Sequence, residues 1–184
     1  MGSFSGRSIV LGVSGSVAAY KAADVARRWV EAGAQVTAVL TAGAQRFITP
    51  LTFTALTGRP ALTNAFALPN GAMPHLDLAK NAAAVLVAPA SANFLARAAG
   101  GQADDLLTSI LLVTRAPVFL APAMHEPMWT HPATQRNVET LKGFGYRILG
   151  PASGALASGD SGIGRMLDPD AIVADMLRTL ASNH

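Results

Sequence analysis

The sequence predicts an α/β domain in which helices cover both faces of a parallel β-sheet. Two observations lead to this fold class. Strand-like and helix-like segments alternate along the chain, which is typical of parallel strands joined by crossover helices. Residues 83–88 and 117–121 are almost wholly apolar, without polar alternation, as strands buried on both faces are. The 184 residues suit a single domain, spanning 1–184, with a core of its own.

The first third of the chain supplies two strands and two helices. Strands are expected at residues 8–13 and 35–41, and helices at 17–32 and 50–56. The first helix carries apolar side chains at helical spacing, and Gly33 stands where it should end. Gly58 closes the second helix in the same way. Residues 64–74 have the composition of a loop.

The alternation continues to the end of the chain. Strands are expected at 83–88, 117–121 and 146–149, and helices at 91–99, 103–113, 132–143 and from Pro169 onward. Asp168 is the predicted N-cap of the last helix, and Gly143 the C-cap of the one before it. Residues 151–164 are rich in glycine and serine, and we expect a mobile loop there.

Composition excludes several classes of site. The chain has no cysteine, so it can form neither a disulfide nor a cysteine-ligated metal centre. Its four histidines include no HxH or HxxxH pair, and no metal site is predicted. No apolar run reaches the roughly 18 residues of a membrane helix, and no signal peptide is visible. We therefore expect a cytoplasmic protein with no membrane partner.

The charge pattern also bears on partners. Lys and Arg number 14 against 11 Asp and Glu, a net charge of +3 without a basic run, so we expect no nucleic-acid partner. Only 14% of the residues are charged, while 51% are hydrophobic. A surface so poor in charge favours burial in an oligomer interface, and we expect a homo-oligomer.

Ligands of such sheets bind at the carboxyl ends of the strands, so the loops that follow strands are the candidate binding sites. In GVSGSVA (residues 12–18), Gly15 permits close backbone approach and Ser16 offers a hydroxyl beside a helix start, which favours a phosphate. The alternative is a tight turn that needs glycine only for its backbone. The second strand ends in Thr41 rather than an acidic residue, which favours a mononucleotide over NAD.

The loop APASANF follows a buried strand and presents two polar side chains. Ser91 and Asn93 would place a hydroxyl and an amide at the strand end, where an amide can read the edge of a heterocycle. Helix capping by Ser91 is the alternative, and both roles can coexist. The pair Asp104-Asp105 complements the dipole of the helix that follows it, which is a structural role for at least one of them.

Two histidines stand out by position. His75 lies in MPHLDL, just before a helix, and His125 lies in the post-strand loop PAMHEPMW. A lone loop histidine is more often structural than functional. His131 precedes Pro132 at a helix start, where a structural role is the better reading.

Taken together, five motifs resemble the flavin-containing cysteine decarboxylases in order and spacing: GVSGSVAAYKA, PHLDLAKNA, APASANFLARAAGGQADDLLTSILL, APAMHEPMW followed by HPATQRNV, and GDSGIGRM. That family includes phosphopantothenoylcysteine decarboxylases and enzymes acting on the C-terminal cysteine of ribosomally made peptides. The resemblance covers residues 9–165. It implies a Rossmann-like (flavodoxin-like) three-layer α/β/α fold that binds FMN at subunit interfaces of a trimer, or of a dodecamer built from trimers.

The resemblance also implies roles for single residues. FMN-binding residues would be Gly15, Ser16, Val17, Thr41, Phe47, Ala90, Ser91, Asn93 and Ser109. His75 corresponds to the catalytic histidine, and His125 joins it as a catalytic residue that positions the substrate carboxylate. Substrate-binding residues would be Met124, Met128 and Ser158, the last within a mobile substrate-covering cap at 151–166.

The implied reaction is an oxidative decarboxylation. FMN oxidises the cysteine thiol to a thioaldehyde, which acts as the electron sink for loss of CO2 and leaves an enethiol. Imidazole can manage protons near neutral pH, so His75 would be the base. Two departures from the family pattern matter: His125 stands where most members have Asn, and Ser158 stands near the position of a cap cysteine that reduces the enethiol.

Three functions remain open, because a histidine at this position together with a cysteine-free cap also resembles the decarboxylase half of actinobacterial two-domain coenzyme A enzymes. The missing cap cysteine favours a peptide substrate with a C-terminal cysteine, because the enethiol is then the product. The alternative is a phosphopantothenoylcysteine decarboxylase of coenzyme A biosynthesis, since AAYK, PHLDL and ADDLLT look more like that branch. A non-catalytic flavin-binding regulatory subunit is the alternative from another class, and the presence of His75 argues against it.

Overall fold

The sheet has five parallel strands in the order β2-β1-β3-β4-β5. A computed structural model describes residues 4–65, 73–155, 159 and 161–181. Its strands are β1 (Ser8–Val13), β2 (Gln35–Leu40), β3 (Ala82–Ala90), β4 (Val118–Pro122) and β5 (Arg147–Ile148). The central strands are buried on both faces, with Val85, Leu86 and Val87 fully inaccessible. Burial on both faces therefore explains why these strands lack polar alternation, as expected.

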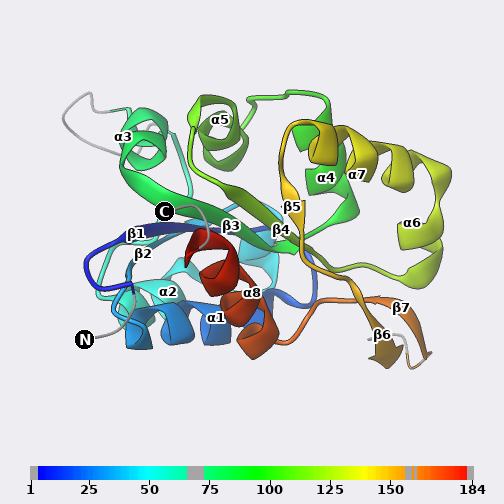
Figure 1. The fold of residues 1–184 in the computed structure, drawn as a ribbon, viewed down its shortest axis with the longest axis horizontal. Coiled ribbons are helices and arrows are strands. Elements are labelled where there is room, and N and C mark those ends of the chain that lie inside the picture. Colours follow the sequence, from blue (N-terminus) through cyan, green and yellow to red (C-terminus); the bar gives the residue numbers. More distant parts are fainter. Residues whose placement is uncertain (1–3, 66–72, 156–158, 160, 182–184) are drawn as a thin grey trace.

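Helices cover both faces of the sheet, giving three layers (Figure 1). The helices are α1 (Ala19–Glu31), α2 (Pro50–Thr57), α3 (Pro74–Asn81), α4 (Ala92–Ala99), α5 (Leu106–Val113), α6 (Glu126–Thr130), α7 (Pro132–Gly143) and α8 (Pro169–Ala181). One core cluster lies between the sheet and α1, α2 and α8. The other lies between the sheet and α3, α4, α5 and α7. The α/β fold class expected from the sequence is confirmed.

Side-chain caps explain where several helices start, whereas the C-cap predicted at Gly143 is wrong: Gly143 is the last residue of α7, and Phe144 is its C-cap. The Ser91 hydroxyl accepts a hydrogen bond from the Phe94 amide at 3.2 Å and caps α4. Asp105 forms a capping box with Thr108 at the start of α5. Nδ1 of His131 accepts from the Ala133 amide at 3.1 Å, so this histidine has the structural role expected of it.

The segment after β5 differs from the sequence expectation. Residues 151–164 were predicted to form a loop, and instead they contribute two antiparallel strands, β6 (Ala152–Ala155) and β7 (Ser161–Arg165). Glycine and serine hide this pairing from a pattern search because they carry no apolar alternation. The sequence also gave no sign of α6 or of the short 3₁₀ turn η1 (Ala44–Arg46).

The strand order fixes where the ligand crevice opens. The chain passes from β1 to β2 on one side and later returns to β3 on the other. Loops that leave the carboxyl ends of β1 and β3 therefore diverge, and a crevice lies between them. In the described part of the chain, no helix combines the length and the apolar character needed to cross a membrane.

Candidate functional site

The loops after β1 and β3 are joined by a buried serine. The Ser14 hydroxyl donates to the Pro89 carbonyl at 2.7 Å and accepts from the Ser91 amide at 2.8 Å. Ser14 is itself 1% exposed. Because both bonds are satisfied away from water, they hold the two loops in a fixed relation. Sequence analysis did not single out Ser14, although it lies in the middle of the motif GVSGS.

Gly15 allows the β1 loop to touch the loop after β2. A Cβ on Gly15 would lie 3.1 Å from both the Cα and the carbonyl carbon of Gly43. That is tighter than ordinary packing, and the neighbour is backbone, which cannot swing away. Glycine is therefore needed here for a close approach, which was one of the two readings of the motif.

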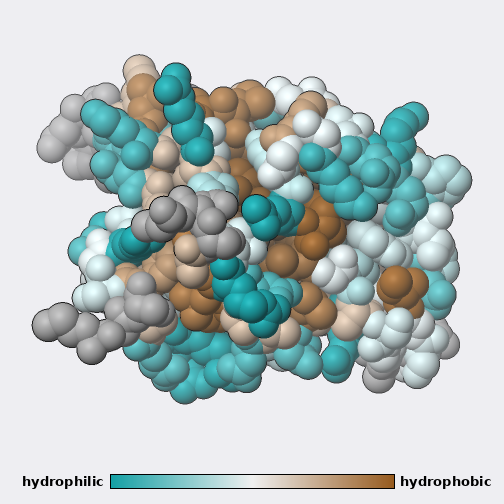
Figure 2. All heavy atoms as spheres, in the orientation of Figure 1, coloured by the Kyte–Doolittle hydropathy of each residue, from teal (hydrophilic) through white to brown (hydrophobic). Residues whose placement is uncertain are grey.

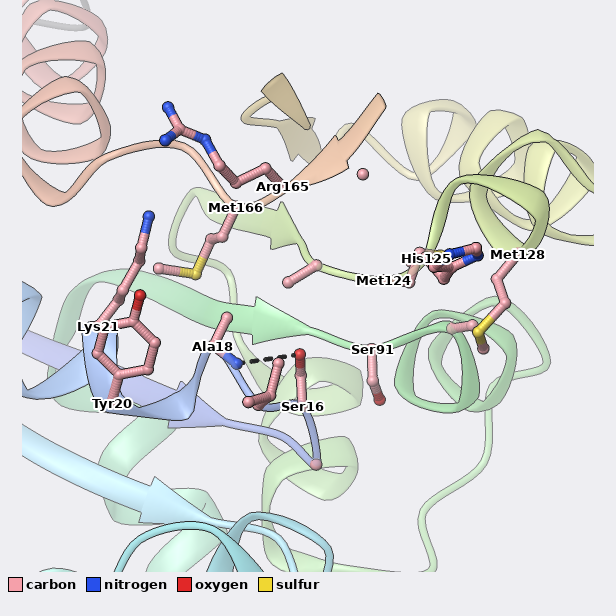
Figure 3. A pocket seen from close by; sticks show the side chains of 15 residues that line it. Ser16, Ala18, Tyr20, Lys21, Ser91, Met124, His125, Met128, Arg165 and Met166 are labelled. Carbon is pink, nitrogen blue, oxygen red and sulfur yellow. Dashed lines mark hydrogen bonds between the residues drawn. The ribbon is translucent and has the colours of Figure 1, made fainter. Parts of the chain in front are cut away.

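Two clefts open on either side of Gly15 and Ser91. The first, here called the histidine cleft, has a volume of about 570 Å³. It is lined from α1, from the loop after β4 and from the end of β7, and Figure 3 shows its side chains. The second, here called the aspartate cleft, has a volume of about 800 Å³ and is lined from the loop after β2, from α4 and from the start of α5.

Most of the predicted site residues fall into these clefts. Gly15 and Ser91 line both; the histidine cleft adds Ser16, Val17, Met124, His125 and Met128, and the aspartate cleft adds Thr41 and Asn93. Four predicted residues line neither cleft: Phe47, His75, Ala90 and Ser109. Ser158 lies outside the described residues.

The residues that line neither cleft have other local roles in one copy of the chain. Ala90 is buried at the end of β3, and its carbonyl accepts from the Ala123 amide at 3.2 Å. The Ser109 hydroxyl donates to the Asp105 carbonyl at 2.8 Å within α5. Phe47 is 56% exposed.

His75 is the second residue of α3, on the face of the sheet that also carries α4, α5 and α7, and it lines neither cleft. Its Nδ1 atom is buried and has no hydrogen-bond partner within the described ranges. A buried ring nitrogen without a partner is costly, and it is suited to a ligand or to a second protein surface.

His125 is held in place by the β-hairpin. It occupies the residue before α6, and its carbonyl accepts from the Met128 and Trp129 amides at 2.9 and 3.0 Å. The neighbouring Met124 amide donates to the Gly164 carbonyl at 3.0 Å. β7 therefore packs along the loop that carries His125, and together they form one wall of the histidine cleft.

A cluster of three charges borders the aspartate cleft. Arg97 pairs with Asp104, and with Asp105 at 2.7 Å. The hydrogen bond from Arg97 holds the pKa of Asp104 below its ordinary value. Asp105 is also the helix cap, so the structural reading of this acidic pair is confirmed for one member.

Several lining residues were not recognised from the sequence. Tyr20 and Lys21 enter the histidine cleft from the first turn of α1, and Arg165 and Met166 enter it from the end of β7. A lysine early in a helix has no special signature, and Arg165 directly follows the segment that was expected to be a loop. Among the described residues, no group of three or more His, Cys, Asp or Glu could hold a metal ion.

The residues around Gly15 fit a phosphorylated mononucleotide. The N-cap residue of α1, Ala18, makes no side-chain capping bond and no acidic residue lies in the first turn, so the positive end of the helix dipole is left for an anion. The Ser16 hydroxyl is beside this helix end, accepting from the Ala18 amide at 3.3 Å (Figure 3). Thr41 and Asn93 add a hydroxyl and an amide on the far side of Gly15, where polar parts of a nucleotide need partners.

The family model described as Flavoprotein matches residues 2–181. The chain belongs to this flavoprotein family. A coenzyme A biosynthesis bifunctional protein CoaBC from Vibrio cholerae is 49% identical over 95% of the chain, which spans only 44% of that relative. The chain thus covers less than half the length of such curated relatives.

Solved structures agree in fold over nearly the whole chain. A PPC decarboxylase variant complexed with pantothenoylaminoethenethiol is 31% identical, with a TM-score of 0.85 over 96% of this chain and 99% of the other. The FMN-dependent cysteine decarboxylase SpaF is 34% identical, with a TM-score of 0.82 over 95% and 97%. The expected class is confirmed: a flavoprotein of the decarboxylase type, a carbon–carbon lyase, with FMN as cofactor.

Proposed function

We propose that this domain decarboxylates phosphopantothenoylcysteine in coenzyme A biosynthesis. The observation that carries the proposal is the match, at 49% identity and along 95% of the chain, to a CoaBC protein. This reverses the order of the two substrates expected from the sequence, where the C-terminal cysteine of a precursor peptide came first. The peptide stays in the experiment below as a second substrate, because the cysteine decarboxylase SpaF is 34% identical to this chain.

Bound FMN would supply the two-electron oxidation of the substrate thiol. Backbone amides at the start of α1, with Ser16, would hold its phosphate, and Thr41, Ser91 and Asn93 would contact the rest of the group. His125 would bind the substrate carboxylate, because an imidazole donates a hydrogen bond and, when protonated, also contributes a positive charge. Met124 and Met128 would exclude water around the group that loses CO2, since both line the same cleft.

We further propose that the active site is completed in a homo-oligomer, a trimer or a dodecamer built from trimers, with FMN at the subunit interfaces. His75 lines neither cleft of its own chain, so a second copy must bring a histidine to the site if it is the base. Large apolar side chains beside it support an interface there. Four large apolar side chains on α3, on α5 or just before α3 are 42–56% exposed: Met73, Leu76, Leu112 and Val113. Figure 2 shows hydrophobic (brown) surface over these helices.

Mass spectrometry separates the substrates. FMN-loaded protein is incubated with phosphopantothenoylcysteine and, in parallel, with a peptide ending in cysteine. Oxidative decarboxylation removes CO2 and two hydrogens, about 46 Da, whereas simple loss of CO2 removes about 44 Da. We expect turnover of the first substrate only, with a loss of about 46 Da if the enethiol is released and of about 44 Da if the two electrons and two protons return to it. Turnover of the peptide alone would replace the proposal by the peptide reading, and no turnover of either would favour the regulatory subunit.

The His75→Asn variant tests the base. It should keep bound FMN, seen by its absorption spectrum, and lose turnover. His131→Asn is the matched control, because Asn caps a helix as well as His131 does and this residue is outside both clefts. Full activity in His75→Asn would remove His75 from the mechanism.

The cytoplasmic location expected from the sequence stays a prediction.

A further inference from the structure

Titratable side chains are few in the histidine cleft. Those that line it are Tyr20, Lys21, His125 and Arg165, and the described lining includes no aspartate or glutamate. The chain has no cysteine either, so no thiol of the protein can act as an acid here. Loss of CO2 leaves an electron-rich carbon on the substrate, and this carbon needs a proton. The four side chains differ in how readily they give one up and in where they lie.

Lys21 and Arg165 are engaged with one carboxylate at a distance from His125. Lys21 Nζ lies 3.1 Å from Asp168, and Arg165 Nη2 lies 3.2 Å from the other oxygen of the same group. Figure 3 shows both cations on the side of the cleft opposite His125 and Met128. An ammonium or a guanidinium is also a much weaker acid than an imidazolium. Neither cation is suited to protonate a carbon bound beside His125.

Tyr20 is no better suited to this task. It lies in the first turn of α1 and is 65% exposed. Figure 3 shows its ring beside the side chain of Lys21, and a phenol is a weaker acid than an imidazolium. His125 therefore remains as the acid of the described cleft.

The backbone fixes the place of His125 in the cleft wall. Its neighbours Met124 and Met128 line the same cleft, and the Met124 amide is bonded to the Gly164 carbonyl at 3.0 Å. The His125 side chain makes no capping bond to α6, so the start of this helix does not depend on the imidazole. A change of the side chain alone should therefore leave the wall in place.

We propose that His125 donates a proton to the carbon that CO2 leaves, after it has bound the carboxylate. The inference rests on the proposed function, in which the imidazole binds that carboxylate. The carboxylate is one bond away from the carbon to be protonated, so a donor held against it is within reach of that carbon once CO2 has gone. An Asn amide at this position would bind the carboxylate but has no acidic proton to give.

The atoms and electrons of this step balance. Loss of CO2 breaks the bond between the carboxylate and its carbon, and the electron pair stays on the substrate as an enethiolate. The imidazolium gives its proton to that carbon, a C–H bond forms, and a thiocarbonyl group forms again on the neighbouring carbon. Reduced FMN, left by the initial oxidation, supplies a hydride to the thiocarbonyl carbon. His125 regains its proton from solvent.

The product is therefore a saturated thiol. It is lighter than the substrate by CO2 alone, about 44 Da, whereas an enethiol released before protonation is lighter by about 46 Da. The mass of the product reports whether the proton was delivered, independently of how fast CO2 leaves.

The experiment mixes FMN-loaded wild-type protein, His125→Asn and His125→Gln with phosphopantothenoylcysteine in the absence of oxygen. Product mass and flavin absorption are measured. Wild-type protein should release the saturated thiol and end with oxidised, yellow FMN. In both variants the ratio of enethiol to saturated thiol should rise at least about tenfold, as loss of a general acid predicts. Their FMN should stay reduced and colourless, because the electrons cannot return to the substrate. His131→Asn, outside both clefts, should behave as wild type.

Two outcomes would overturn the inference while leaving decarboxylation of this substrate intact. Saturated thiol as the main product of His125→Asn, with only slower release of CO2, would limit His125 to binding the carboxylate. Enethiol as the main product of wild-type protein would show that no proton is delivered. Failure of the proposed function looks different, because wild-type protein would then release no CO2 from phosphopantothenoylcysteine, and that result would overturn both.

Discussion

At the scale of single residues, His125 stands where the family resemblance implies an Asn in most members. An Asn amide binds a carboxylate as a neutral donor, whereas an imidazole also binds it as a cation. His125 lines the histidine cleft beside Met124 and Met128, so its position agrees with contact to substrate.

We predict that His125→Asn keeps part of the activity and that His125→Leu loses most of it. Asn can still donate one hydrogen bond to the carboxylate, and Leu can donate none. The measurement is the rate of CO2 release by FMN-loaded protein under saturating substrate. Equal and full activity in both variants would return His125 to the ordinary role of a loop histidine.

At this scale, the sequence predicted site residues correctly where the local backbone geometry also restricts which residue type can be used. Gly15 and Ser91 stand out because a close approach and a helix cap restrict residue type. Ser14, Lys21 and Arg165 were missed, because a buried hydroxyl bridge and a cation pair join residues distant in sequence. Such contacts leave no local pattern.

At the scale of elements, the β6–β7 hairpin supports the loop of His125. The Gly164 backbone lies against Met124, with the hydrogen bond from the Met124 amide at 3.0 Å. A Cβ on Gly164 would collide with the Met124 carbonyl, and the φ of +147° at Gly164 is one that only glycine adopts readily.

The Gly164→Ala variant should therefore be destabilised by about 1–3 kcal/mol, because a backbone carbonyl must shift to admit the methyl group. Activity should fall as well, since the shift moves His125. Thermal unfolding and turnover measure the two effects. Gly143→Ala, where a Cβ meets nothing within 4 Å, is the control and should be neutral or slightly stabilising. Equal behaviour of the two variants would show that the hairpin does not hold the loop.

At the scale of the whole molecule, acid should unfold the protein partly through its paired carboxylates. Arg97 lowers the pKa of Asp104, and Lys21 lowers that of Asp168, from the ordinary value of 3.8. The stabilisation from such groups is complete above that value and is lost as the pH falls through the lowered folded-state pKa.

We predict that Asp104→Asn flattens the dependence of stability on pH below about pH 4, where the wild-type carboxylate takes up its proton. Thermal unfolding between neutral pH and about pH 2 measures the slope. Glu139→Gln, which removes a surface pair with Lys142 within α7, is the control and should change the slope less. Identical slopes in Asp104→Asn and wild type would contradict the link to Arg97.

The proposed oligomer makes a further prediction for the molecule as a whole. Leu112→Glu, on the exposed side of α5, should dissociate the assembly and release FMN, because a charge would be buried in an apolar interface. Sedimentation and the flavin spectrum are the measurements. Leu51→Glu, on α2 in the other layer, should leave the assembly intact. Dissociation by Leu51→Glu alone would place the interface on the opposite face.

The sequence by itself determined the layered α/β fold and the loops that carry the site, and its resemblance to a known family implied the cofactor. These follow from short-range patterns: apolar runs, helix spacing, caps and motifs of a few residues. Only the tertiary structure paired β6 with β7, joined two loops through Ser14, and gathered Lys21, Arg165 and His125 around one cleft. The physical reason is that strand pairing, buried hydrogen bonds and charge sharing connect distant residues, and the fold decides which of them meet.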